Sequence, residues 1–143
     1  MTIINGALAP RFRVKCTWTS YPDKKHYFCS MIWIELTNLT ELETLLDEEI
    51  APKHYLIFKN STRCGTSRMA LKQFEKRWNE IMPAYLVNVV ENREVSDAIT
   101  GFFEIRHESP QILLIRNGEC VFNASHSMIE AEDILRLAGS ENF

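Results

Sequence analysis

The stretch FKNSTRCGTSRMALKQF, residues 58–74, passes from an apolar run into a helical pattern, with a single cysteine at the junction. The run HYLIFK (54–59) that leads into it is rich in aromatic and branched residues, which is typical of a strand covered on both faces. After Cys64, apolar residues recur at helical spacing as far as Pro83, namely Ala70, Leu71, Phe74, Trp78 and Ile81. The stretch therefore predicts a buried central strand followed by a helix that begins at Cys64.

Upstream of this stretch, residues 32–36 are a candidate for a short edge strand. Four leucines then recur at helical spacing after Asn38 and Thr40, either of which is a suitable N-cap: Leu39, Leu42, Leu45 and Leu46. We expect this first helix to end before Pro52.

Downstream, AYLVNVV (84–90) reads as a second buried strand, and the apolar residues between Val95 and Phe103 predict another helix. The runs QILLIR (111–116) and ECVFNA (119–124) flank Asn117-Gly118, a strong signal for a β-hairpin. Ser127 and Glu130 have capping-box spacing, which predicts a last helix opening there and stopping at Gly139.

The predicted order of elements is α-β-α-β-α-β-β-α, which is an α/β fold. A strand, a helix and a strand in succession require a parallel pair, whereas the hairpin adds antiparallel strands. We expect a mixed four-stranded sheet flanked by helices, with an N-terminal helix and a possible extra edge strand. This order, with a proline directly before the hairpin, resembles the thioredoxin fold over about residues 37–139.

Composition narrows the classes of function. The chain has 143 residues, 45% of them hydrophobic, which suits one core. A formal charge of −3, without a basic run interleaved with aromatics, makes nucleic acid a poor partner. No apolar stretch reaches the roughly 18–20 residues that span a bilayer, and no signal-peptide core is evident. We expect a cytoplasmic protein that does not enter a membrane.

Residues 1–30 differ from the rest of the chain. They contain five basic residues and one acidic residue, and they show no sustained strand or helix period. We predict a flexible or non-native N-terminal extension, followed by a thioredoxin-like domain over residues 31–143. A targeting segment is the alternative interpretation of these residues.

The spacing of the four cysteines does not fit a zinc site, so no metal is expected: Cys16, Cys29, Cys64 and Cys120. Cys64 stands out because a helix N-terminus presents unpaired N–H groups that favour a thiolate. Arg63 and Arg68 add positive charge nearby, and the polar residues before Cys64 argue against burial. We therefore predict that Cys64 is a reactive thiol.

Ser67 stands where a C-x-x-C motif would carry its second cysteine, and a serine cannot form a disulfide. Its hydroxyl either donates to the Cys64 thiolate or satisfies a backbone group in the first helical turn. Cys120 is expected beside the hairpin turn, roughly 15–20 Å from Pro110 at ~3.3 Å per residue, where it packs. The chemistry left to Cys64 is exchange with an external thiol. A C-x5-R phosphatase loop is excluded because Ala70 stands at the arginine position.

Four motifs, STRCGTS, ENREVSD, RHESPQILLIRNG and NASHS, resemble in order those of the monothiol bacilliredoxin family, which are thioredoxin-like proteins of the bacillithiol system. The resemblance implies removal of bacillithiol from S-bacillithiolated proteins during oxidative stress. Bacillithiol is then a low-molecular-weight thiol co-substrate, and no other cofactor is expected.

The resemblance also implies residue roles. Cys64 corresponds to the attacking cysteine and Ser67 to its non-cysteine partner, while Ser109-Pro110 corresponds to a cis-proline loop beside the thiol. Gly65 departs from the family pattern, in which a proline is expected. The predicted substrate-binding set is Arg63, Gly65, Thr66, Ser109, Pro110, Ser125, His126 and Ser127. The last three lie where related glutaredoxins bind a carboxylate at a helix start.

Three further residues near these motifs, Lys59, His107 and Glu108, are expected to be structural. We expect Lys59 to be solvated and the other two to anchor a loop by hydrogen bonds, and contact of His107 and Glu108 with the site is the alternative. Two other functions remain open: a non-catalytic binding or stress-adaptor module whose cysteine is only S-thiolated, and a thiol peroxidase. The peroxidase pattern requires threonine three residues before the cysteine, where this chain has Ser61. The sequence does not indicate an oligomeric state.

Overall fold

The structure is a computed structural model that describes residues 31–78 and 82–139. The predicted N-terminal extension, with Cys16 and Cys29, lies outside the described residues, as does Ile81. The predicted boundary at residue 30 therefore stays a prediction.

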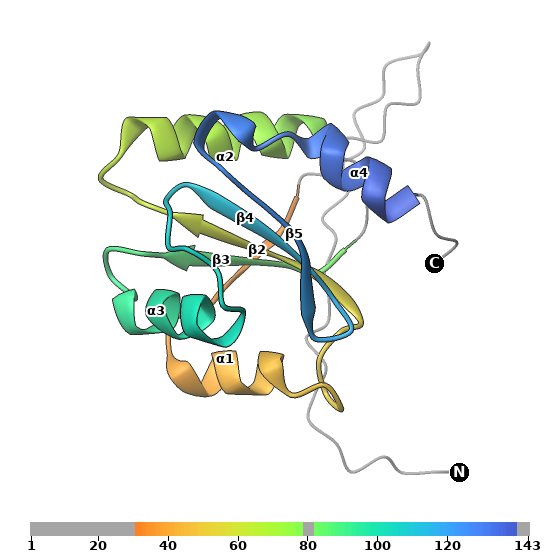
Figure 1. The fold of residues 1–143 in the computed structure, drawn as a ribbon. Coiled ribbons are helices and arrows are strands. Elements are labelled where there is room, and N and C mark those ends of the chain that lie inside the picture. Colours follow the sequence, from red (N-terminus) through yellow and green to blue (C-terminus); the bar gives the residue numbers. More distant parts are fainter. Residues whose placement is uncertain (1–30, 79–81, 140–143) are drawn as a thin grey trace, which may run out of the picture. The chain divides into compact units, whose positions relative to one another are not determined.

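The core of the fold is one mixed sheet with the strand order β1-β3-β2-β4-β5 (Figure 1). β1, β3 and β2 are parallel, whereas β4 is antiparallel to both β2 and β5. The α/β prediction is confirmed, and the possible edge strand is present as β1, so the sheet has five strands and not four. The strands are β1 (Trp33–Glu35), β2 (His54–Asn60), β3 (Ala84–Asn88), β4 (Gln111–Arg116) and β5 (Glu119–Ser125).

Four helices cover the two faces of this sheet, α1 and α3 on one side and α2 and α4 on the other (Figure 1). They are α1 (Leu39–Leu46), α2 (Gly65–Arg77), α3 (Arg93–Phe102) and α4 (Ala131–Gly139). The alternation of side chains along β2 divides the core in two: Tyr55 and Ile57 face α1 and α3, while Leu56 and Phe58 pack beneath α2 and α4. β2 is thus the doubly covered strand that its apolar run predicted.

Most predicted elements are present, with three corrections. The helix after Cys64 was predicted to run as far as Pro83, but α2 ends at Arg77, because Trp78 has extended backbone angles. Asn38 caps α1, its Oδ1 accepting from the N–H of Glu41 at 2.9 Å. The second buried strand, β3, ends at Asn88 and not at Val90. The capping-box prediction is wrong: residues His126–Met128 form a separate 3-10 helix, η1, and α4 begins only at Ala131. Ile129, which ends η1, has extended backbone angles of φ −79° and ψ 99°, so the helix does not continue.

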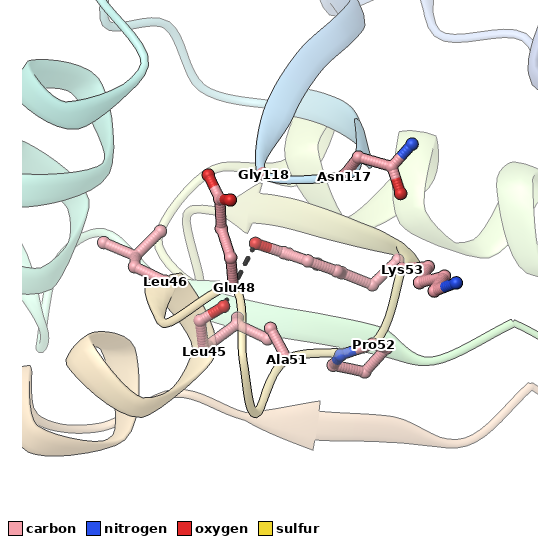
Figure 2. A pocket seen from close by; sticks show the side chains of 9 residues that line it. Leu45, Leu46, Glu48, Ala51, Pro52, Lys53, Asn117 and Gly118 are labelled. Atoms are coloured by element: carbon pink, nitrogen blue, oxygen red, sulfur yellow. Dashed lines mark hydrogen bonds between the residues drawn. The ribbon is translucent and has the colours of Figure 1, made fainter.

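The hairpin turn marks the end of the sheet that is remote from Cys64. Gly118 occupies the left-handed region at φ 77°, and a Cβ there would meet the Glu48 carboxylate at 2.6 Å. A cavity of about 130 Å³ lies beside this turn, between it and the segment that follows α1 (Figure 2). Tyr55 also lines this cavity, and its hydroxyl donates to the carbonyl of Leu45 at 3.3 Å. We do not assign this cavity to the chemistry of Cys64, because Cys64 follows the opposite end of β2.

Candidate active site

Cys64 is the N-cap residue of α2, with extended backbone angles of φ −107° and ψ 120°. It is partly exposed, and its backbone closes the first turn, because the Arg68 N–H donates to its carbonyl at 3.2 Å. The side chain makes no capping hydrogen bond of standard geometry. Even so, the N–H groups of Ser67 and Thr66 lie close enough to the sulfur to lower the pKa of Cys64. The site therefore favours the thiolate, as predicted from its place at a helix start.

The donors around the sulfur are amides and hydroxyls. After the two N–H groups, the hydroxyls of Thr66 and Ser67 also lower the pKa of Cys64. Arg63 and Arg68 are exposed, and neither guanidinium is among the groups that lower this pKa. The expectation that the two arginines add to the local stabilisation is not supported, whereas the expectation for the helix N-terminus is confirmed.

Ser67 is fully buried on the inner side of α2. Its hydroxyl has no hydrogen-bond partner of standard geometry among the described residues, so it does not satisfy a backbone group in the first turn. Its side chain is nevertheless the last of the groups that lower the pKa of Cys64, so a role toward that sulfur stays a prediction.

The Ser109-Pro110 loop lies at the same end of the sheet as the segment that leads to Cys64. Lys59 and Gln111 are cross-strand partners in β2 and β4, so both segments leave the sheet there. The Ser109-Pro110 peptide bond is cis, as the family resemblance predicted. Pro110 is buried, and its carbonyl accepts from the N–H of His126 at 3.0 Å. Within the described residues no hydrogen bond joins this loop to Cys64 directly.

Side-chain hydrogen bonds connect this loop to the hairpin. The amide of Gln111, 1% exposed, donates to the Arg106 carbonyl at 3.0 Å and accepts from the Glu108 N–H at 3.3 Å. Ser125 donates a hydrogen bond to the Glu108 carboxylate. The loop-anchoring role expected of Glu108 is thereby confirmed, and Ser125 belongs to the same anchor.

His126 and Ser127 are exposed and do not stand at the start of a long helix, because α4 begins later. They line a second cavity, of about 110 Å³, between α2 and η1, together with Gln73, Arg77 and Glu130. Arg77 pairs there with Glu130 at 3.3 Å. The argument for anion binding at a capped helix start therefore loses its physical basis in this chain, although both residues remain beside α2.

Lys59 is the residue whose environment sequence analysis missed. The expectation that it is solvated is wrong: the side chain is 0% exposed. Its ammonium donates to Thr100 Oγ1 at 3.0 Å and contacts His107 Nδ1 at 2.7 Å. The signal in the sequence was its position inside HYLIFK, a run that was itself predicted to be covered on both faces.

Cys120 belongs to β5 and pairs with Ile115, near the hairpin turn and away from the Cys64 end. It packs against the core beneath α1 and α3, and burial raises the pKa of its thiol. The prediction that it packs is confirmed. In the described part of the chain, no group of three His, Cys, Asp or Glu side chains is arranged to hold a metal. None of the helices described there has the length and hydrophobicity needed to cross a membrane.

Solved structures similar to this chain share the fold. One is a thioredoxin-fold protein described as a candidate oxidoreductase, with a TM-score of 0.67 and 30% identity over 79% of this chain and 98% of its own. Schistosoma mansoni thioredoxin has a TM-score of 0.57 and 23% identity over 73% of this chain and 94% of its own. Fasciola hepatica thioredoxin has a TM-score of 0.57 and 18% identity over 76% of this chain and 98% of its own.

The thioredoxin-like fold is thus shown by topology and by these similarities. The sequence pattern of the family described as "Monothiol bacilliredoxin BrxC" matches residues 34–134, which include Cys64, Ser67 and the Ser109-Pro110 loop. This range covers more than half of the chain and supports a thiol redox role. The chain belongs to the monothiol bacilliredoxin BrxC family.

Proposed function

We propose that the protein is a thiol-disulfide oxidoreductase that removes bacillithiol, or a similar low-molecular-weight thiol, from protein mixed disulfides. The observation that carries the proposal is the environment of Cys64, a partly exposed thiol at the start of α2 whose pKa is lowered by two backbone N–H groups. A serine at position 67 leaves no second thiol in the first turn of that helix, so one sulfur performs the chemistry.

The reaction consists of two exchanges. The Cys64 thiolate attacks the small-thiol sulfur of the mixed disulfide, and the client protein leaves as a thiolate, which then takes a proton. Cys64 now carries the small thiol in a mixed disulfide of its own. A second small thiolate attacks that bound sulfur, which releases a symmetric small-molecule disulfide and restores the Cys64 thiolate. The amides and hydroxyls that stabilise the thiolate also make Cys64 a good leaving group in this step.

The substrate-binding roles proposed for the surrounding residues follow from their positions. Gly65 and Thr66 form the first turn beside the sulfur, and Arg63 directly precedes it. Ser109 and Pro110 end a loop on the same edge of the sheet, with Ser125, His126 and Ser127 next to it. We propose that these two segments contact the disulfide from either side, in a cytoplasmic setting where S-bacillithiolated proteins are the clients. Support for bacillithiol comes from the family match alone.

The test is to incubate the full chain with a bacillithiolated protein and excess bacillithiol, and to measure release of the client thiol. We expect repeated turnover with the wild type and none with Cys64→Ser. Cys120→Ser should behave as the wild type, because its half-buried thiol lies at the other end of the sheet. Release that persists in Cys64→Ser would refute the proposal. Capture of the small thiol on Cys64 without its later release would instead favour the stress-adaptor function.

The identity of the small thiol is tested in the same assay. Glutathione and coenzyme A, each presented as a mixed disulfide with the same client, replace bacillithiol in parallel reactions. We expect turnover to be fastest with bacillithiol. Equal rates with all three thiols would contradict a preference for bacillithiol.

A further inference from the structure

An unusual group lies behind the proposed active site: the amine of Lys59, fully buried near the end of β2. Lysine is almost never fully buried without a partner, because removing its charge from water is costly. In the described residues Lys59 has no carboxylate within ion-pair distance, and Asp97 on α3 acts on it only at longer range. Its two polar partners are Thr100 and His107.

The donor and the acceptor in each of these hydrogen bonds follow from which groups carry protons. The Thr100 hydroxyl donates to the Ser96 carbonyl at 3.0 Å, so its oxygen is free to accept from Lys59. A charged Lys59 has only protons to offer, so His107 Nδ1 must accept from it and the imidazole is neutral. The Ser96 hydroxyl is a second neighbour of Nδ1, at 3.4 Å. Lys59 thus joins three segments: β2, α3 and the loop that begins near His107.

That loop is the one that carries Ser109 and Pro110. Gln111 and Glu108 tie its far end to the hairpin, but the described residues give the His107 side chain no other partner than Lys59 and Ser96. The backbone of Lys59 also pairs with Gln111, and Lys59 lies five residues before Cys64. One residue is therefore connected to both segments of the proposed site.

We propose that Lys59 is a positioning residue, which holds the 106–110 loop beside Cys64 through its charged hydrogen bond to His107. This inference rests on the proposed thiol exchange. Lys59 acts on the loop and not on the sulfur, since the groups that lower the pKa of Cys64 belong to its own helix turn. A misplaced loop slows exchange with a protein disulfide and leaves the intrinsic reactivity of the thiol intact.

The hydrogen bond between Lys59 and His107 depends on pH, because it needs a charged lysine and a neutral histidine. Burial lowers the pKa of Lys59 to about 8, with the charge of Asp97 acting in the opposite direction. Burial and the charge of Lys59 lower the pKa of His107; Arg93 adds to this, and the carboxylates of Asp97 and Glu108 oppose it. Two cations face each other at low pH, and the lysine loses its charge above about pH 8. The hydrogen bond is strongest in between.

The test compares Lys59→Met with two variants of its partner. His107→Asn places an amide oxygen where Nδ1 lies, whereas His107→Leu offers no acceptor. We expect the rate of exchange with a bacillithiolated protein to fall about tenfold in Lys59→Met and in His107→Leu, and to be largely retained in His107→Asn. Alkylation of Cys64 by iodoacetamide should proceed at the wild-type rate in all three. The decline of exchange above pH 8 should be absent in Lys59→Met.

Three outcomes of the rate measurements would overturn the inference. The first is unchanged exchange in Lys59→Met, and the second is an equal effect of His107→Asn and His107→Leu. The third is a parallel fall of alkylation and exchange, which would place the effect on the sulfur. Amide hydrogen exchange of residues 106–109 gives a measure that does not need turnover: we expect faster exchange in Lys59→Met. Absence of turnover in the wild type would refute the proposed function, and unchanged amide protection would refute the positioning role.

Discussion

At the scale of the residue, the chemistry of this site depends on how donors are arranged around one sulfur. The two largest contributions to the lowered pKa of Cys64 come from backbone N–H groups, which no side-chain substitution removes. Hydroxyl groups of Thr66 and Ser67 add smaller contributions. The hydroxyl of Ser67 is buried and has no other partner in the described part of the chain, so its effect can be tested separately from its packing.

We predict that Ser67→Ala raises the pKa of Cys64, because a hydroxyl near the thiolate is lost while both N–H groups remain. The free energy of unfolding should change by less than about 1 kcal/mol, since the buried hydroxyl leaves no orphaned partner behind. The rate of iodoacetamide alkylation as a function of pH gives the pKa. Ser61→Ala removes a nearby hydroxyl that does not act on the sulfur and is the control. An unchanged or lower pKa in Ser67→Ala would contradict the role assigned to this residue.

Single residues were predictable from the sequence where local patterns set their environment. Cys64 follows a buried strand and opens a helix, and both features can be read within a few residues of it. Lys59 was misjudged because its burial comes from α3 and from the loop around His107, which are some forty residues or more away along the chain. The apolar run HYLIFK indicated a covered strand, but no local pattern indicated that Thr100 and His107 would be the partners of the Lys59 amine.

At the scale of the element, the geometry of the first turn of α2 determines whether proline can replace Gly65. Gly65 is the first residue of the helix, and a Cβ built there meets no atom within 4 Å. Proline is favoured at this position, where the N–H has no acceptor within the helix. Cys64, with φ −107° and ψ 120°, already has the extended conformation that a residue before proline adopts.

We therefore predict that Gly65→Pro, which introduces the residue expected from the family pattern, raises the free energy of unfolding by about 0.4–1 kcal/mol. The gain arises because proline restricts the unfolded chain and fits the folded one. Urea denaturation measures it, with Gly101→Pro as the matched control. Gly101 lies inside α3, where a proline should cost about 3 kcal/mol. Destabilisation by both substitutions would show that the start of α2 is not as open as its geometry indicates.

Other elements show where prediction from sequence ends. The hairpin was located correctly because Asn117-Gly118 supplies the two backbone conformations with positive φ that such turns use. The last helix was placed three residues too early, because Ser127 and Glu130 have capping spacing but lie in and after η1. His126, a non-glycine residue at φ 53°, is the first residue of η1, and nothing in its residue type indicated this conformation.

At the scale of the whole molecule, the sheet divides the core into two layers, and each layer includes one feature of the site. The layer beneath α2 holds Ser67, while the layer beneath α3 holds the amine of Lys59. An apolar side chain at position 59 would continue the second layer. The charge there consequently opposes folding, a trade of stability for function that is common at active sites.

The contribution of Lys59 to the free energy of unfolding changes with pH in a definite direction. Burial lowers the pKa of Lys59 to about 8, whereas a lysine in an unfolded chain titrates near 10.4. Between about pH 8 and 10.4 the unfolded state binds a proton that the folded state does not, so Lys59 makes stability rise with pH through this range. Below about pH 8 both states hold the proton, and the full cost of the buried charge is present.

We predict that Lys59→Met raises the free energy of unfolding at pH 7 by about 1–3 kcal/mol, because the penalty of a buried ammonium is removed. The difference between the variant and the wild type should shrink as the pH approaches 10, when the wild-type amine is neutral. Urea denaturation at pH 7, 8.5 and 10 measures both effects, and taking the difference removes the contribution of the thiols and tyrosines common to the two proteins. Lys53→Met, on the exposed side chain that precedes β2, is the control and should leave stability within about 0.5 kcal/mol. A Lys59→Met protein that is less stable than the wild type at pH 7 would contradict this prediction. It would mean that the hydrogen bonds to Thr100 and His107 outweigh the cost of desolvating the charge. Lys59 would then stabilise the fold and would not be retained for function.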